Sequence, residues 1–167
     1  RYMSVGQAMI PLVLRAPDGL INQGAAQHSQ SVEAWFVHIP GLKVVAPSNA
    51  EDAKAVLKAA IEDPNPVLYF EHKNLFKRTF TVPDKKDEKP YQIGKAKIRK
   101  EGNDITLVSY SKTMIAVNEA ASVLADEGIS CEVIDLISLS PCDKETVLSS
   151  IRKTHHLCIC HEAVKQG

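Results

Sequence analysis

The stretch "SNAEDAKAVLKAAIEDPNPVLYFE", residues 48 to 71, contains the best-marked change from helix to strand in the chain. Its apolar residues recur at i, i+3, i+4, i+7 and i+8, the spacing of one buried helix face. These residues are Ala53, Val56, Leu57, Ala60 and Ile61. Ser48 and Glu51 have the spacing of a capping box, which predicts the start of the helix. Pro64 and Pro66 end it, and the run "VLYFE" then predicts a strand.

The same alternation of strand and helix extends over the rest of the chain. Short apolar runs predict further strands at residues 10–15, 42–47, 104–111, 130–136 and 156–162. Segments whose apolar residues recur with helical spacing predict further helices at residues 29–38, 112–127 and 140–154. For the last two helices we expect the buried residues to be Ala116, Ala120, Val123 and Leu124, and Val147, Leu148 and Ile151.

A polar, charged and proline-flanked segment, "VPDKKDEKPYQIG", interrupts this pattern after residue 81. It has little to bury and is typical of a linker. Strand runs separated by amphipathic helices predict parallel sheets with helices packed on them. The predicted fold class is therefore α/β, with two successive units that have mainly parallel sheets. The units are residues 1–83 and 92–167, and residues 84–91 link them.

Composition excludes several classes of function. The chain has 20 basic and 20 acidic residues, so no strong field favours nucleic acid or an anionic membrane surface. No apolar run approaches the roughly 20 residues of a membrane helix. Glycine-rich phosphate-binding motifs are absent from the sequence. The four cysteines match neither a disulfide scaffold nor a paired CxxC zinc site, which favours a reducing compartment. We expect Cys158 and Cys160 to be buried in a core strand.

His28 is the first candidate functional residue, in the segment "GAAQHSQSVEAWFVH", residues 24–38. In one interpretation it only caps its own turn or packs against Trp35. In the other it lies at a helix N-terminus, where the partial positive charge of the helix favours a neutral imidazole. Such a ring keeps one donor and one acceptor for a substrate or a proton. The residues alone leave both interpretations open.

The corner "AAIEDPNP", residues 59–66, is the second candidate. It can be a solvated helix end that a proline stops. The unpaired carbonyl groups of a helix C-terminus, together with the side-chain oxygens of Asp63 and Asn65, also suit a hard cation.

Several segments together resemble a known family, in the same order and over nearly the whole chain. They are "RYMSVGQ", "PLVLRAPDG", "AAQHSQSVEAWFVHIPGLKVVAPSNAEDAKAVLKAAIEDPNPVLYFE", "IGKAKIRKEGNDITLVSYS" and "CEVIDLISLSPCDKETV". The family is the beta subunits of the thiamine-diphosphate-dependent 2-oxo acid dehydrogenases. The resemblance implies the later part of a pyrimidine-binding domain, then an incomplete transketolase C-terminal-type domain. It also implies that the chain is incomplete at both ends. The glutamate by which the family contacts the cofactor then lies outside this sequence, so we assign no cofactor-binding residue here.

The resemblance implies an activity and its partners. The activity is oxidative decarboxylation of pyruvate or a branched-chain 2-oxo acid, with acyl transfer to lipoamide; acetoin is handled by similar subunits. Thiamine diphosphate with Mg²⁺ would be shared with an alpha subunit, and a K⁺ ion would be structural. The partners would be the alpha subunit and a second beta subunit in a heterotetramer, a lipoyl acyltransferase and the small 2-oxo acid, without nucleic acid or membrane. The compartment would be the cytoplasm in bacteria, and the mitochondrial matrix or plastid in eukaryotes.

The resemblance also assigns residues. His28 matches an active-site histidine of the family. The positions that match its potassium site are Leu12, Ala60, Ile61, Asp63 and Asn65. Two alternatives stay open at this point: a fragment of a transketolase-like single-chain enzyme, and a non-catalytic assembly or binding module of the same fold.

Overall fold

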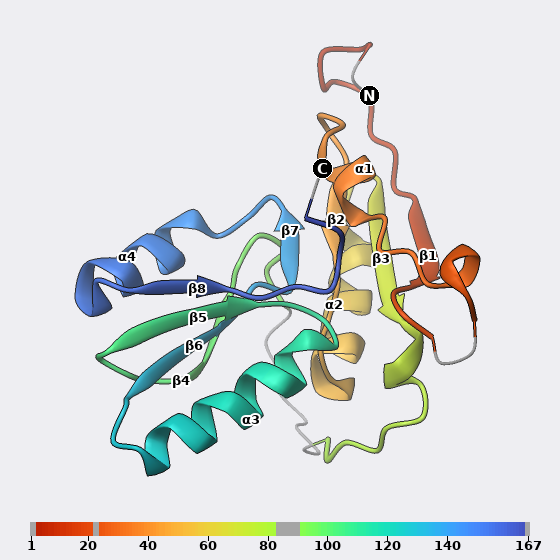
Figure 1. Ribbon diagram of the computed structural model, residues 1–167. Helices are drawn as coiled ribbons and strands as arrows, with labels where there is room; N and C mark the ends of the chain where they lie inside the picture. Colours follow the sequence, from red (N-terminus) through yellow and green to blue (C-terminus); the bar gives the residue numbers. More distant parts are fainter. Residues whose placement is uncertain (1–2, 22–23, 83–90, 166–167) are drawn as a thin grey trace.

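The computed structural model describes residues 3–21, 24–82 and 91–165. Within these residues it has two four-stranded sheets, whose strands run in different directions in Figure 1. The first sheet contains β1 (Val13–Asp18), β2 (Lys43–Val45), β3 (Val67–His72) and β7 (Ser138–Ser140). The second contains β4 (Lys97–Lys100), β5 (Ile105–Ser109), β6 (Cys131–Asp135) and β8 (Leu157–Ile159). The helices are α1 (Glu33–Val37), α2 (Ala50–Glu62), α3 (Thr113–Asp126) and α4 (Lys144–Thr154), with short 3₁₀ turns η1 (Ala26–His28) and η2 (Lys73–Leu75).

The first sheet has the order β1-β3-β2-β7, and only β7 is antiparallel to its neighbour. Helix α2 packs on one face, where Val56 and Ala60 meet Val45, Val67 and Tyr69. The short helix α1 covers the other face, where the rings of Phe36 and Phe70 lie 5.6 Å apart. Strand β7 comes from the part of the chain that the sequence assigns to the second unit. That unit therefore adds an edge strand to the first sheet.

The second sheet has the order β4-β6-β5-β8, with parallel pairing of β5 to both neighbours and antiparallel pairing of β4. Successive residues of β5 face opposite sides, so the two helices pack against different side chains. Leu107 belongs to the apolar core under α3, whereas Thr106 hydrogen-bonds Ser150 and Thr154 of α4, at 2.6 Å each. The prediction of an α/β fold with two mainly parallel sheets is confirmed. No helix in the described part of the chain is long and apolar enough to span a membrane.

Several predicted boundaries are wrong by a few residues. The strand expected at residues 10–15 is β1, which begins at Val13 and continues through Pro17 to Asp18. The helix expected at residues 29–38 begins only at Glu33. The predicted linker, residues 84–91, lies almost entirely outside the described residues.

The predicted capping box of α2 is also wrong. Asn49 is the N-cap, and its side chain accepts a hydrogen bond from the backbone N–H of Asp52 at 2.9 Å. Ser48 instead donates to the carboxylate of Asp135 in the second sheet, at 2.5 Å. A residue that resembles a cap in the sequence thus joins two sheets, because a distant strand supplies a stronger acceptor.

The buried faces of four elements differ from the predictions. Helix α3 buries Met114, Val117 and Ala121, while the expected Ala116, Ala120 and Val123 are exposed. Helix α4 buries Ser150 and Thr154 and leaves Leu148 half exposed, because it docks through hydroxyl groups. Ile61 of α2 is 64% exposed. Strand β8 lies at the sheet edge, so Cys158 is exposed and Cys160 is half-buried, contrary to the expected burial of both.

Candidate functional site

A hollow of about 430 Å³ lies beside the carboxyl ends of β1 and β3. We call it the His28 hollow, and its lining residues are Pro17, Asp18, Ile21, Gln27, His28, Gln30, Val32 and Lys73. Asp18 is the last residue of β1, and Lys73 directly follows β3. The carboxyl ends of parallel strands are where α/β proteins commonly bind ligands.

Contacts from two sides hold the turn that carries His28. The Nζ of Lys73 donates to the backbone carbonyl of His28 at 2.5 Å, and the Nε2 of Gln30 donates to that of Ala26 at 2.7 Å. A Cβ added to Gly24 would lie 2.1 Å from the side chain of Ile21, so a side chain there would force Ile21 to move. The His28 side chain itself is exposed. The turn is fixed, and its imidazole faces solvent at the hollow.

The local structure contradicts one argument made for His28. His28 is the last residue of the η1 turn, and α1 begins five residues later, at Glu33. His28 therefore does not lie at the N-terminus of the helix that holds Trp35. The helix dipole acts mainly within the first turn, so it does not account for a neutral imidazole here. The catalytic role of His28 stays a prediction.

Sequence reasoning missed a pair of buried acids next to this turn. Asp18 is 4% exposed and Glu33 is 6% exposed. Asp18 Oδ2 and Glu33 Oε2 are buried, and no donor group of the described residues gives either of them a hydrogen bond. Burial, together with the charge and hydrogen bonding of Glu33, raises the pKa of Asp18 to about 8. The string "PDG" resembles an exposed turn, so nothing local signals that its aspartate is buried.

A third acid near the hollow, Glu162, is fully partnered. Glu162 Oε1 lies 2.9 Å from His72 Nε2 and accepts a hydrogen bond from the backbone N–H of Leu20 at 2.5 Å. The Nδ1 of His72 accepts from the backbone N–H of Asn74, so in the neutral ring Nε2 carries the proton and donates to Glu162. Burial would raise the pKa of Glu162, but its hydrogen bonds and the charges of His72 and Lys112 lower it overall. Glu162, which follows β8, thus ties the second sheet to the ends of β1 and β3.

The backbone at the end of β1 fits closely against His72. A Cβ on Gly19 would come within 2.3 Å of the imidazole ring, and Gly19 has a φ of +77°. Only glycine meets both demands. Asp18 and His72 are paired in the register of β1 and β3, so both lie at the carboxyl ends of these strands.

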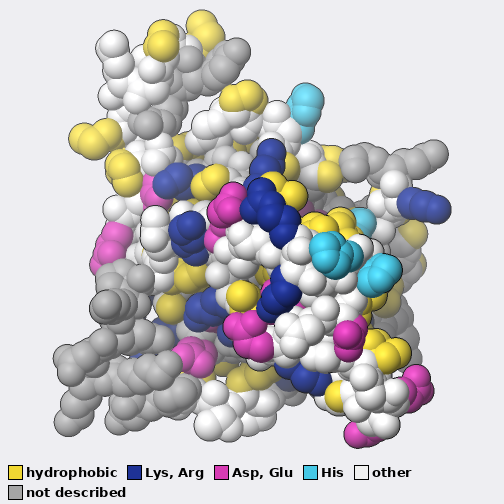
Figure 2. Space-filling model, turned by 90° about the vertical axis from the view of Figure 1, so that its left-hand side faces the viewer, with side chains coloured by type: hydrophobic (Ala, Val, Ile, Leu, Met, Phe, Trp, Pro, Cys, Tyr) yellow, Lys and Arg dark blue, Asp and Glu magenta, His cyan; other side chains and the backbone are white. Residues whose placement is uncertain are grey.

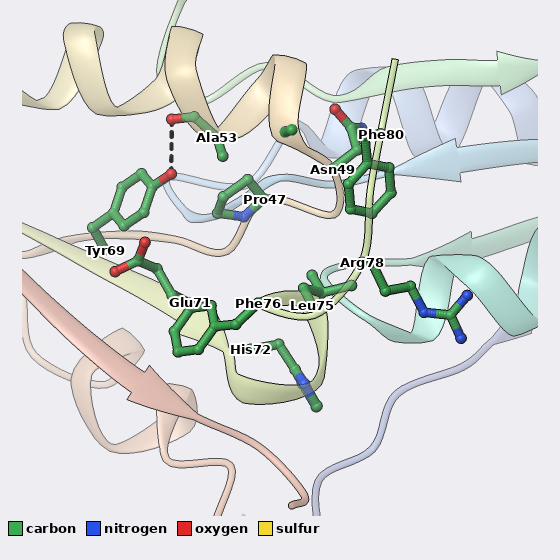
Figure 3. A pocket seen from close by; sticks show the side chains of 11 residues that line it. Pro47, Asn49, Ala53, Tyr69, Glu71, His72, Leu75, Phe76, Arg78 and Phe80 are labelled. Atoms are coloured by element: carbon green, nitrogen blue, oxygen red, sulfur yellow. Dashed lines mark hydrogen bonds between the residues drawn. The ribbon is translucent and has the colours of Figure 1, made fainter. Parts of the chain in front are cut away.

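Another pocket, of about 140 Å³, lies between the start of α2 and the segment after β3 (Figure 3). The polar side chains of Tyr69 and Glu71 in its wall already have partners. Tyr69 donates to the backbone carbonyl of Ala53 at 2.8 Å, and Arg15 binds both carboxylate oxygens of Glu71, at 2.7 and 3.0 Å. The side chain of Arg78 extends away from Tyr69 and Glu71 in Figure 3. We see no converging chemistry in this pocket.

The structure brings the predicted potassium ligands to one region. The backbone N–H of Val67 donates to the carbonyl of Leu12 at 2.8 Å, and that of Ile10 donates to the carbonyl of Pro64 at 2.9 Å. These bonds place the strand at Leu12 beside the corner of residues 60–65. The neighbourhood is rich in oxygen, as a hard cation requires.

Asp63 already has a cationic partner, however. Its Oδ2 accepts from Lys43, and its Oδ1 accepts from the side chain of Asn65 at 2.7 Å. Burial would raise the pKa of Asp63, but these contacts lower it overall. A potassium ion at this corner would therefore rely on backbone carbonyls and share the carboxylate with Lys43.

The surface does not concentrate one sign of charge on the face that Figure 2 presents. Basic and acidic side chains are interspersed there, and a few histidines gather at one side. This mixture agrees with the equal numbers of basic and acidic residues.

Two family models match the chain in succession. "Transketolase, pyrimidine binding domain" matches residues 1–79, and "Transketolase, C-terminal domain" matches residues 94–167. Among solved structures, a split-gene transketolase described as an inactive beta4 tetramer has 28% identity and a TM-score of 0.79. It covers 93% of this chain and 49% of that one. A transketolase mutant from Pichia stipitis, at 18% identity and a TM-score of 0.63, shares the fold over 87% of this chain and 22% of its own.

Curated relatives are more similar in sequence. The beta-2 subunit of the pyruvate dehydrogenase E1 component of Oryza sativa is 45% identical over 99% of this chain and 44% of its own length. The corresponding beta subunit of Caenorhabditis elegans is 49% identical over 93% of this chain and 45% of its own, and that of Rhizobium meliloti 48% identical over 99% and 36%. This chain thus spans less than half the length of these relatives. The chain thus has a transketolase-type pyrimidine-binding domain followed by a transketolase-type C-terminal domain, and nearly its whole length is similar to the pyruvate dehydrogenase E1 beta subunits.

Proposed function

We propose that this chain is part of the beta subunit of a 2-oxo acid dehydrogenase. Together with an alpha subunit, it would catalyse oxidative decarboxylation of pyruvate or a branched-chain 2-oxo acid and transfer the acyl group to lipoamide. The strongest support for this proposal is the 45–49% identity to pyruvate dehydrogenase E1 beta subunits over 93–99% of the chain. The match to the split-gene transketolase, at 28% identity, gives weaker support to the alternative of a transketolase-like enzyme.

The His28 hollow fits the reacting side of such an enzyme. It is open, lies at the carboxyl ends of parallel strands and combines apolar walls at Ile21 and Val32 with polar groups. Thiamine diphosphate, held with Mg²⁺ between this subunit and an alpha subunit, would supply the carbanion that attacks the 2-oxo carbon. We assign none of its contacts to this chain. This chain's own residues shape the wall that a substrate meets.

Within that wall, His28 would orient the substrate and hold a proton. Its imidazole has one nitrogen that donates and one that accepts in the neutral form. The contact of Lys73 with the His28 carbonyl fixes the backbone, so the ring can be held at one place. Such a positioned group typically contributes about 10²–10⁴-fold to the rate.

The test is His28→Ala in the full-length beta subunit assembled with its alpha partner and supplied with a lipoyl acceptor. Turnover should fall about 10²–10⁴-fold. Folding and thiamine diphosphate binding should change little, because the side chain is exposed and leaves no cavity. His156→Ala, at another exposed histidine, is the matched control and should keep normal turnover. Near-normal turnover of His28→Ala would show that His28 only stabilises its turn.

A structural potassium ion at the corner of residues 60–65 is part of the proposal. Its ligands would be the carbonyls of Leu12, Ala60 and Ile61 and the side-chain oxygens of Asp63 and Asn65. Support comes from the hydrogen bonds that place Leu12 beside this corner. Melting temperature should rise with KCl more than with equal choline chloride, and Asp63→Asn should reduce that difference. Equal melting temperatures in the two salts would contradict the site.

A further inference from the structure

The proposed reaction leaves the buried acids Asp18 and Glu33 without a role, although Asp18 lines the His28 hollow. Asp18 ends β1 and Glu33 begins α1, so rigid elements hold both. Each has one buried carboxyl oxygen that no donor group of the described residues reaches. Two ionised carboxylates side by side and out of water repel each other and lose their hydration. A shared proton relieves both penalties.

The neighbouring charges do not neutralise this pair. Among the described residues no lysine or arginine forms an ion pair with Asp18 or Glu33. Lys73 acts on Asp18 only from a distance, while its ammonium group binds the backbone carbonyl of His28. Glu162 adds negative charge. The other charged or titratable groups around the ends of these strands are His28, His72, Lys112 and Tyr110.

We propose that Asp18 and Glu33 hold one proton between them at neutral pH and so keep the His28 hollow able to accept the carboxylate of a 2-oxo acid. This inference rests on the proposed function for the chemistry of the substrate. Asp18 acts as a positioning residue in this scheme, since it sets the charge of the wall and does not react. When the proton leaves in alkali, the pair carries two negative charges and repels an anionic substrate.

The charges give the direction of the effect. With one proton, the pair carries one negative charge, which Lys73 offsets in part. Loss of the proton adds a full negative charge to the wall of the hollow. Over several ångströms in a partly hydrated site, one extra charge weakens anion binding by about tenfold or more. The raised pKa of Asp18, about 8, places this change just above neutrality.

The first experiment measures kcat/KM and KM for pyruvate and for a branched-chain 2-oxo acid, from pH 6 to 9.5. It uses the full-length beta subunit with its alpha partner and cofactors. In the wild type, KM for the better substrate should rise about tenfold across pH 8, with a smaller change in kcat. Asp18→Asn keeps the size of the side chain but cannot ionise, so its KM should lack this rise. Glu33→Gln should move the rise toward acid, because it removes the neighbouring charge. Glu101→Gln, at an exposed acid of the second unit, is the matched control and should keep the wild-type profile.

A second measurement does not depend on turnover. The infrared difference spectrum between wild type and Asp18→Asn should contain a protonated carboxylic acid band at pH 7 that disappears above pH 9. If neither 2-oxo acid is turned over at any pH, the proposed function fails while this band still tests the shared proton. Absence of the band at pH 7, or an unchanged rise of KM in Asp18→Asn, would overturn the inference. Should Asp18→Asn fail to fold, Glu33→Gln provides the same two readouts.

Discussion

The molecule buries two pairs of acids and treats them in opposite ways. Asp52 and Asp135 are both 0% exposed, and Arg99 contacts both carboxylates, at 2.7 Å in the case of Asp135. Lys97 also pairs with Asp52, and Ser48 donates to Asp135. We call these five residues the Arg99 cluster. Asp18 and Glu33 are almost as deeply buried, yet no cation pairs with them among the described residues.

The positions of the two pairs explain the difference. The Arg99 cluster joins α2 of the first sheet to β4 and β6 of the second, where charge compensation holds the two units together. The Asp18–Glu33 pair lies where β1 ends, beside the His28 hollow. Natural sequences leave such penalties uncorrected mainly at functional sites. Asp135 Oδ1 is also buried and receives no hydrogen bond from the described residues, so an unpaired oxygen does not separate the two pairs. The difference is that a cation pairs with Asp52 and Asp135, whereas none of the described lysines or arginines pairs with Asp18 or Glu33.

The largest expected effect comes from removing the compensation. Arg99→Met keeps much of the side-chain volume but leaves Asp52 and Asp135 buried with only Lys97 nearby. Breaking a buried ion pair in this way typically costs about 3–5 kcal/mol. We expect that loss in the free energy of unfolding of the full-length subunit, measured by urea denaturation at pH 7.

Two further variants check that the loss is electrostatic. Lys97→Met removes one cation from Asp52 but keeps Arg99, and Lys97 is 38% exposed at its side chain, so its cost should be clearly smaller. Adding Asp135→Asn to Arg99→Met should recover part of the stability, because an amide carries no charge to leave unpaired. A loss in Arg99→Met that Asp135→Asn does not reduce would point to packing instead.

The elements of the fold could be predicted from the sequence because their signals are local. Apolar runs predict β3, β5 and β6, and periodicity predicts α2 to within two residues. The capping residue and the buried faces of α3 and α4 could not be predicted. They depend on which distant groups dock: Asp135 attracts Ser48, and Thr106 attracts the hydroxyl groups of α4. The pairing of β7 with the first sheet is likewise set by tertiary structure.

The candidate site divides in the same way. His28 stood out from the sequence because its segment resembles a family motif, and the structure places it at a hollow. The Asp18–Glu33 pair left no signal, since the two acids lie 15 positions apart in the sequence and their burial arises only when β1 meets α1. The sequence also gave no sign that Arg99 pairs with Asp52 and Asp135, because these residues meet only in the folded structure.

The second expected effect is a stabilisation that depends on pH. The folded state raises the pKa of Asp18 to about 8, above the roughly 4 of an unfolded aspartate, so the folded state binds the proton more tightly. Stability should therefore fall as pH rises from about 4 to about 8 and then level off. Asp18→Asn cannot titrate and should escape this loss. We expect it to be more stable than wild type by about 1–3 kcal/mol at pH 8.5 and nearly equal at pH 4.5.

Thermal unfolding of both proteins across this pH range provides the measurement. Asp52→Asn is the control, because Lys97 and Arg99 pair with this buried acid. Contacts with Lys97 and Arg99 outweigh burial and lower the pKa of Asp52, so this variant should destabilise above pH 4. A gain of stability in Asp18→Asn together with a loss in Asp52→Asn would confirm that only the second pair of buried acids is compensated by cations. The same sign at both sites would refute it.

The smallest effect is expected where an acid pairs with a cation in water. Arg152 and Glu145 of α4 lie 3.3 Å apart, with side chains 67% and 75% exposed. Solvent screens such a pair, and ordering two long side chains offsets most of the attraction. Arg152→Ala should therefore change the free energy of unfolding by no more than about 0.5 kcal/mol, at any pH between 5 and 9. A loss comparable to that of Arg99→Met, measured by the same urea denaturation, would mean that distance alone sets the strength of a pair. A negligible loss would show that burial decides it, as the two buried acid pairs already indicate.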